Sequence, residues 1–153
     1  MKRLAALLAV LLCLVASSAL AQRIECPVGG FSVTLPDHFV EGSLDPDRNP
    51  ELCFYWYGKK LTVLGYASWM GEVADSDLFQ VLAGNEEDPV MLYINDMQMS
   101  YSYSEDPDAS RITITYSWMD RGNKVTLYFD FEDPSVEETV NSIIYSISFD
   151  AGH

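Results

Sequence analysis

The sequence predicts an α+β fold in which two packed helices lie on an antiparallel β-sheet of five to seven strands. Three observations support this prediction. Several short segments alternate apolar and polar residues, which is typical of strands with one buried face. Turn-forming residues separate these segments at short intervals. The last segment instead repeats its apolar residues with the period of a helix.

The first half of the chain contains three expected strands. Phe31–Leu35 alternates apolar and polar side chains and ends at a proline. Leu52–Tyr57 is rich in aromatic residues, and Leu61–Ser68 follows it across a short turn. Because the turn is short, we expect these last two strands to pair as a hairpin.

The second half contains four more expected strands. Val90–Ile94 and Met97–Ser104 are the first two. Residues 112–119 and 125–131 then alternate apolar and polar side chains with a period of two, separated by the turn sequence Asp120–Asn123. The turn between two alternating segments predicts a long hairpin.

Two helices complete the expected fold. Asp75–Ala83 is a short one, which Asp75 or Ser76 can cap and Gly84 can end. The second begins near Pro134, where the missing N–H costs nothing. Its apolar face consists of Val136, Val140, Ile143, Ile144 and Ile147. We expect that face to be buried on the sheet.

Residues 1–21 have the features of a secretory signal peptide. Two basic residues precede the apolar run Leu4–Val15, and Ala19–Ala21 supplies small residues for cleavage before Gln22. Two alternatives stay open, namely lipid attachment at Cys13 and an uncleaved N-terminal anchor. The expected location is secreted, either periplasmic or in the extracellular envelope.

Residues 22–153 are the length of a single domain with its own core. The whole chain has a net charge of −14, and removal of Lys2 and Arg3 leaves seven basic and 23 acidic residues, a net charge of −16. Such a charge argues against binding nucleic acid or anionic lipid. The domain has no apolar segment long enough to span a membrane.

The domain contains two cysteines, Cys26 and Cys53. An even pair in an oxidising compartment predicts a disulfide bond. Two free thiols and a metal-binding pair are the alternatives, although neither cysteine belongs to a CxxC motif or has a histidine nearby in sequence.

Two segments carry a family resemblance. Gly30–Phe39 contains a strand ending in Leu-Pro-Asp, and Ile143–Phe149 closes the C-terminal helix. Together they resemble the PsbP-like superfamily, which includes DcrB-type bacterial envelope proteins. This resemblance implies a PsbP-like sandwich of helices and sheet, and binding or assembly roles without a shared catalytic motif. The chain departs from the family pattern at His38, where glycine is usual.

The sequence offers no motif for catalysis or for a cofactor. It lacks the GxSxG and HExxH patterns, and within the domain His38 is the one histidine besides the terminal residue. The acidic loop Asp45–Glu51 alternates oxygen-bearing side chains like the start of a calcium-binding loop, but it has proline where that loop needs glycine. Whether this loop binds calcium stays open, and no catalytic, cofactor-binding or metal-binding residue is predicted.

Aromatic residues are more numerous than one buried face can hold. Because neighbouring strand residues point to opposite faces, some of these rings must lie on a second face. The candidate ligand-face aromatics are Tyr55, Tyr57, Tyr101 and Tyr103. The alternative is that these rings form a second small core beneath loops.

These observations predict a non-enzymatic domain, secreted or of the cell envelope, that binds a protein or cell-surface partner. The alternative is a carbohydrate- or small-ligand-binding module that uses an exposed aromatic sheet face. An enzyme is the third possibility.

Overall fold

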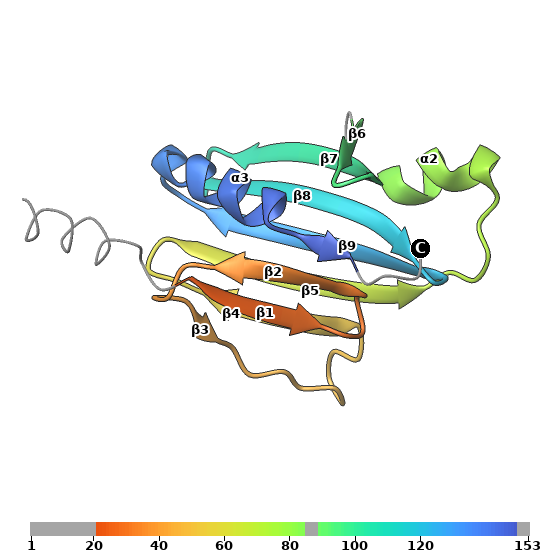
Figure 1. Ribbon diagram of the computed structural model, residues 1–153. Helices are drawn as coiled ribbons and strands as arrows, with labels where there is room; N and C mark the ends of the chain where they lie inside the picture. Colours follow the sequence, from red (N-terminus) through yellow and green to blue (C-terminus); the bar gives the residue numbers. More distant parts are fainter. Residues whose placement is uncertain (1–20, 85–88, 150–153) are drawn as a thin grey trace, which may run out of the picture.

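The computed structural model describes residues 21–84 and 89–149 (Figure 1). The expected signal peptide, apart from Ala21, lies outside the described residues, as does Cys13. Among the residues described, no helix combines the length and the apolar content needed to cross a bilayer.

The larger of two antiparallel sheets has seven strands. They are β3 (Val40–Glu41), β4 (Leu52–Tyr57), β5 (Leu61–Trp69), β6 (Val90–Ile94), β7 (Met97–Asp106), β8 (Arg111–Asp120) and β9 (Asn123–Phe131). Their order across the sheet is β3-β4-β5-β9-β8-β7-β6. The expected hairpins therefore form, and β5 joins them by pairing with β9 along its whole length.

A second, three-stranded sheet was not expected from the sequence. It has the order β1-β2-β10, with β1 at Gln22–Cys26, β2 at Phe31–Leu35 and β10 at Ser148–Phe149. In this sheet Ser148 pairs with Ser32, so the last described strand lies beside β2 (Figure 1). We call it the small sheet and the seven-stranded one the large sheet.

The two expected helices are present. Helix α2 spans Asp75–Ala83, and its expected cap is wrong, because Ala74 is the N-cap and no side chain caps this helix. Gly84 ends it with a φ of 59°, as expected. The C-terminal helix begins with a short 3-10 turn, η1 (Pro134–Val136), and continues as α3 (Glu137–Tyr145).

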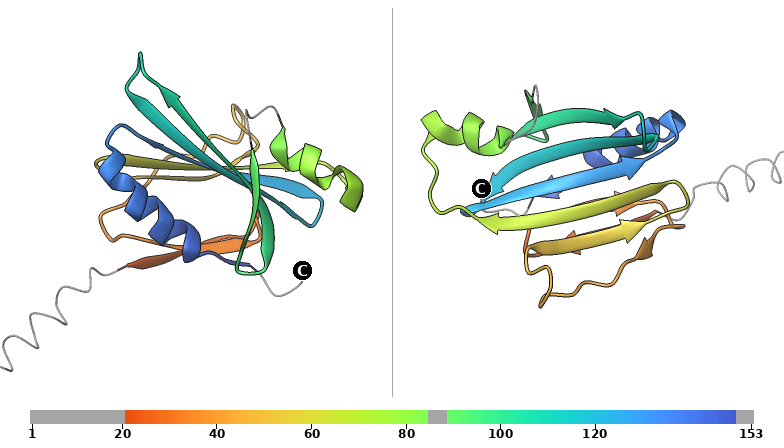
Figure 2. Two further views of the ribbon diagram at one scale, coloured as in Figure 1. Left: turned by 90° about the horizontal axis from the view of Figure 1, so that it is seen from above. Right: turned by 180° about the vertical axis from the view of Figure 1, so that it is seen from behind.

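The two faces of the large sheet are covered unequally. Helix α3 and the small sheet lie on one face, which we call the inner face (Figure 2). Helix α2 lies near one end of the opposite, outer face, where the Ser100 hydroxyl donates a 3.0 Å hydrogen bond to the Leu82 carbonyl. The view from behind in Figure 2 shows β4, β5 and β9 with no helix in front of them. The predicted α+β class is thus confirmed.

The core fills the space between the inner face, α3 and the small sheet. Trp118 is fully buried at its centre and meets Phe31 and Phe149 edge-on, at ring-centroid distances of 5.3 and 5.8 Å. Buried partners come from three elements: Val125, Leu127 and Phe129 of β9, Val33 and Leu35 of β2, and Val140, Ile143 and Ile144 of α3. Strand β2 and helix α3 together bury the apolar face of the central hairpin, which is formed by β8 and β9.

Two tight turns hold the strands in register. Arg121 and Gly122 both have positive φ angles in the β8–β9 turn, as a two-residue hairpin turn requires. Asn95 and Asp96 do the same between β6 and β7. The Asn95 amide also donates a 2.5 Å hydrogen bond to the Ile147 carbonyl. This bond links the β6–β7 hairpin to the chain that follows α3.

Gly30 allows the small sheet to approach the β8–β9 hairpin closely. Its φ angle is +64°, and a Cβ atom there would overlap the carboxylate of Asp120, which is 3% exposed. Asp120 also lies 3.2 Å from the Arg121 guanidinium. Side-chain bulk at residue 30 would therefore push the small sheet away from the hairpin.

We predict that Gly30→Ala lowers the free energy of unfolding by about 2–4 kcal/mol, because a left-handed backbone cost adds to the overlap with Asp120. Gly71→Ala is the matched control, since Gly71 has a φ of +75° but nothing within 4 Å of a Cβ atom. That variant should lose only about 1 kcal/mol. Urea denaturation measures both, and equal losses would contradict the close approach at Gly30.

Candidate functional site

The structure places the four candidate tyrosines on opposite faces of the large sheet. Tyr101 pairs with Tyr116, which pairs with Leu127 of the buried inner face. Tyr55 pairs with Leu64, which pairs with Tyr128 of the outer face. Since residues two apart in a strand share a face, Tyr57 lies outward with Tyr55 and Tyr103 inward with Tyr101. The four rings therefore do not form a single patch.

Tyr101 and Tyr103 lie at the margin of the core beside α3. The rings of Tyr101 and Tyr116 are 5.3 Å apart. Burial, and after it the negative charge of Glu137, raises the pKa of Tyr101. Burial raises the pKa of Tyr116 to about 12. Because Tyr116 is buried and Tyr101 packs against the core, this pair of rings acts as an extension of the core.

Four tyrosines lie together on the uncovered part of the outer face, and we call this set the tyrosine face: Tyr55, Tyr57, Tyr66 and Tyr128. The rings of Tyr66 and Tyr128 meet edge to face, with centroids 5.7 Å apart and planes at 87°. Tyr57 is 41% exposed, and the other three are partly exposed. The patch is therefore ordered by its own ring contacts while remaining accessible to solvent.

Two open depressions adjoin on this face and share Leu64, Arg111 and Asp130. The first has a volume of about 630 Å³ and is also lined by Tyr55, Gly58, Lys59, Lys60, Leu61, Thr62, Phe131, Glu132 and Asp133. The second has a volume of about 510 Å³ and is also lined by Glu51, Tyr66, Ser68, Thr113, Lys124, Thr126 and Tyr128. Volumes of this size are typical of small-molecule sites.

A polar cluster lies where the two depressions meet. Arg111 Nη2 donates a 2.5 Å hydrogen bond to Asp130 Oδ2, and Thr113 Oγ1 donates one of 2.7 Å to Oδ1 of the same carboxylate. The Asp130 side chain is 13% exposed, whereas that of Arg111 is 55% exposed. The hydrogen bond to Asp130 raises the pKa of Arg111. The cluster is a fixed group of donors and acceptors at the margin of the tyrosine face.

A second ion pair lines the first depression. Lys60 Nζ lies 2.5 Å from Asp133 Oδ2. The hydrogen bonds that Asp133 accepts from Lys60 and Ser135 lower its pKa to about 2. Both residues are exposed, so the pair positions the β4–β5 turn beside η1 and adds little to stability.

Cys26 and Cys53 are neighbours in the fold, with their Sγ atoms 3.7 Å apart. Both are free cysteines here, so the expected disulfide is not present in the structure. A β-bulge between Leu52 and Phe54 turns Cys53 toward the end of β1 and the core. The contact with Cys53 lowers the pKa of Cys26, and the same contact raises that of Cys53.

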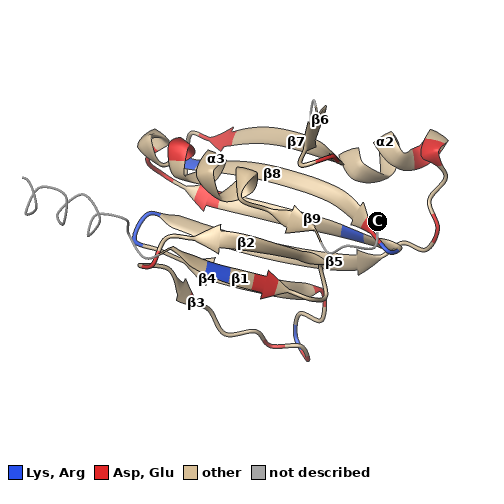
Figure 3. Cartoon of the chain, in the orientation of Figure 1, with Lys and Arg blue, Asp and Glu red and all other residues tan. Residues whose placement is uncertain are grey.

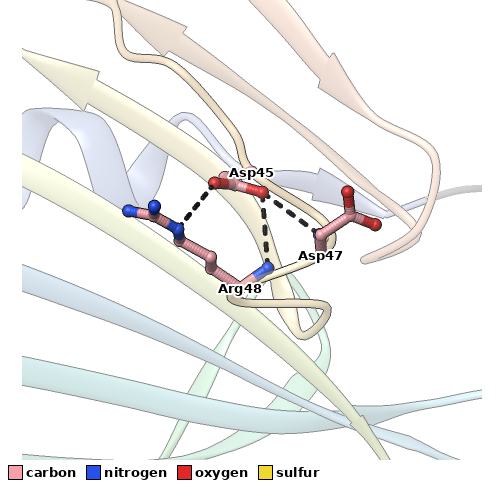
Figure 4. Close-up of polar contacts among 3 residues, drawn as sticks. All are labelled: Asp45, Asp47 and Arg48. Atoms are coloured by element: carbon pink, nitrogen blue, oxygen red, sulfur yellow. Dashed lines mark hydrogen bonds and ion pairs between the residues drawn. The ribbon is translucent and has the colours of Figure 1, made fainter.

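The acidic loop uses its first carboxylate within the loop itself (Figure 4). Asp45 Oδ1 accepts hydrogen bonds from the backbone N–H groups of Asp47 and Arg48, at 3.2 and 3.3 Å. Asp45 Oδ2 lies 3.5 Å from Arg48 Nε. Over the described ranges, no group of three or more His, Cys, Asp or Glu side chains is arranged to hold a metal ion.

His38 follows β2 in an exposed turn. Its Nδ1 lies 3.9 Å from Asp37 Oδ1, and both side chains are about half exposed. The ring also packs against Phe39, with centroids 5.1 Å apart. The ring also lies against Gly58, where a Cβ atom would meet Nε2 at 3.3 Å, so His38 borders the first depression, which Gly58 lines.

Sequence reasoning missed several residues of the outer face, namely Arg111, Asp130, Tyr66 and Tyr128. One signal could have found two of them. Val125, Leu127, Phe129 and Phe131 predict the buried face of the hairpin, so Tyr128 and Asp130 must face outward. The position of Tyr66 beside Tyr128 on the outer face depends on the pairing of β5 with β9, and no local sequence pattern specifies that pairing.

Comparison with known proteins identifies the fold. No protein-family model matches the chain, and no curated protein matches it by sequence. The solution structure of cyanobacterial PsbP (CyanoP) from Synechocystis sp. PCC 6803 matches with a TM-score of 0.61 at 8% identity, covering 86% of this chain and 93% of that one.

A crystal structure from Bacteroides thetaiotaomicron matches with a TM-score of 0.60 at 10% identity. It covers 86% of this chain, which spans about half, 49%, of that longer chain. At such low identities the matches concern the fold alone. They bear out the resemblance noted in the sequence, and the protein has a PsbP-like fold.

Proposed function

We propose that this protein is a non-enzymatic binding domain that is secreted or resides in the cell envelope. It binds a protein or cell-surface partner on the tyrosine face of its large sheet. The single observation that supports this proposal is the unequal covering of the sheet. The inner face is buried by α3 and the small sheet, while β4, β5 and β9 present four accessible tyrosines and two adjoining depressions outward.

Exposed tyrosines are well suited to a surface that binds a partner. A tyrosine ring offers a large apolar area with one hydroxyl, and it loses little conformational entropy on binding. Ring contacts between Tyr66 and Tyr128, and between Tyr55 and Tyr57 at 5.7 Å, restrict these side chains before any partner arrives. Such preorganisation reduces the entropic cost of binding.

The binding role is also favoured by the chemistry around the depressions. Their charged residues include the pairs Arg111–Asp130 and Lys60–Asp133, in which each charge is already neutralised by a partner. His38 borders the first depression beside Gly58, and its side chain is exposed, with Nδ1 3.9 Å from the exposed Asp37 carboxylate. The pairing of these charges favours recognition over acid–base or nucleophilic catalysis.

The proposed location rests on residues 1–21, with cleavage before Gln22. An exported domain with 23 acidic residues against seven basic ones would remain soluble outside the cell. In an oxidising compartment, the neighbouring thiols of Cys26 and Cys53 can be joined by transferring two electrons and two protons to a disulfide donor.

We predict that a photo-crosslinking amino acid in place of Tyr57 forms an adduct with a partner in cells that produce the full chain. The matched control is the same substitution at Tyr103, because Tyr57 and Tyr103 are 41% and 43% exposed but lie on opposite faces. Gel shifts followed by mass spectrometry identify the adducts. Adducts from position 103 and none from position 57 would contradict the proposed surface.

We predict that the exported protein contains a disulfide between Cys26 and Cys53. Its intact mass should be two hydrogens below that of the reduced chain, and neither cysteine should react with an alkylating reagent until reductant is added. The bond would close a loop of 27 residues. Reduction, or the double substitution Cys26→Ser and Cys53→Ser, should therefore cost about 3 kcal/mol of stability. Alkylation of both cysteines without reductant would refute the bond.

A further inference from the structure

We propose that the outer depressions bind a neutral carbohydrate chain, with sugar rings on the tyrosine face and sugar hydroxyls on the Arg111–Asp130–Thr113 cluster. This inference rests on the proposed function, because it names the class of ligand that the same face accepts. Three properties of the site support it: the ring surfaces, the unused hydrogen-bonding capacity of the cluster and the local balance of charge.

The ring surfaces suit the apolar side of a sugar. A sugar ring carries C–H groups on its faces and hydroxyls around its rim, and the negative face of an aromatic ring attracts such C–H groups. Tyr66 and Tyr128 stand at 87° to one another and line one depression, while Tyr55 lines the other. Gly42 packs against the Tyr55 ring, since a Cβ atom at that glycine would overlap Cγ, Cδ1 and Cε1, so this contact holds the ring in place.

The polar cluster can form hydrogen bonds with two neighbouring hydroxyls of a sugar. Each hydroxyl can donate one hydrogen bond and accept others, so two adjacent hydroxyls need both donors and acceptors within reach. An ionised carboxylate can accept about four hydrogen bonds. Asp130 accepts one on each oxygen, from Arg111 and Thr113, so it can accept about two more. Arg111 gives one of its N–H groups to Asp130 and is 55% exposed, so further donors face the solvent.

The charge of the lining favours a neutral ligand. Among the described residues, the two depressions are lined by four basic side chains (Lys59, Lys60, Arg111 and Lys124) and four acidic ones (Glu51, Asp130, Glu132 and Asp133). This balance contrasts with the net charge of −14 for the whole chain, and Figure 3 shows acidic residues at the first turn of both helices and at strand ends. A cationic partner would prefer those acidic surfaces, and an anionic one would be repelled by them.

The shape of the site favours an extended ligand. The depressions hold about 630 and 510 Å³, lie side by side and share Leu64, Arg111 and Asp130. A chain of sugar rings can therefore run across both without a gap. A second copy of this protein fits less well, because two exported domains, each with seven basic and 23 acidic residues, repel one another.

The test uses isotope-labelled protein purified from cells that express the full chain. Neutral hexasaccharides of glucose, mannose and N-acetylglucosamine are titrated by NMR, with a heparin hexasaccharide as the anionic comparison. We expect at least one neutral probe to shift signals from β4, β5, β8 and β9 and to leave those of α3 unchanged. Heparin should bind more weakly than that probe.

Two variants test the contacts. Asp130→Asn keeps the side-chain shape but removes the carboxylate, and Tyr66→Leu removes a ring, so each should weaken binding by about tenfold. Tyr103→Leu on the opposite face is the matched control and should leave the affinity unchanged. Circular dichroism and the thermal midpoint confirm that each variant is folded.

Three outcomes would overturn the inference: no neutral probe binds, heparin binds best, or the shifts fall outside the outer face. If neutral probes fail while position 57 crosslinks to a protein, the carbohydrate inference is wrong and the proposed binding function stands. If neither probe binding nor crosslinking occurs at the outer face, both proposals are wrong.

Discussion

The apolar face of the β8–β9 hairpin must be buried, and the way in which this happens determines the rest of the structure. Trp118 and its neighbours are covered by α3 from one direction and by β2 of the small sheet from another. Both coverings come from the ends of the chain, which are joined by the pairing of β10 with β2. An antiparallel sheet needs only one buried face, so once the inner face is covered, the part of the outer face that α2 does not cover can stay open.

The outer face of the large sheet combines polar side chains with exposed tyrosine rings. Polar residues such as Thr113 and Asp130 alternate with the core residues of the same strands, and Tyr66 and Tyr128 add ring surface between them. The uneven exposure of the two sheet faces thus connects the packing of the core to the proposed binding function. The close approach at Gly30 and the contact between Cys26 and Cys53 both hold the small sheet in place, on the face opposite to the proposed binding surface.

Periodic patterns within single segments of the sequence predicted the elements that such segments specify by themselves. The central hairpin and α3 followed from periods of two and of 3.6 residues, and both are present. Strand β1 was missed because Arg23 and Glu25 are polar, and β10 because it pairs with a segment more than a hundred residues away. The division of the tyrosines between faces depends on the pairing of β5 with β9 and of β7 with β8, which alternation within one strand does not specify.

The central claim is that one face of the large sheet is buried and the other is accessible. Hydroxyl-radical footprinting of the free protein, with oxidised peptides mapped by mass spectrometry, measures this directly. The structure predicts rapid oxidation of Tyr57 and measurable oxidation of Tyr66 and Tyr128, whereas Tyr116, which is 5% exposed, should be protected. Protection of the three outer tyrosines to the level of Tyr116 would mean that the outer face is covered, and would contradict the claim.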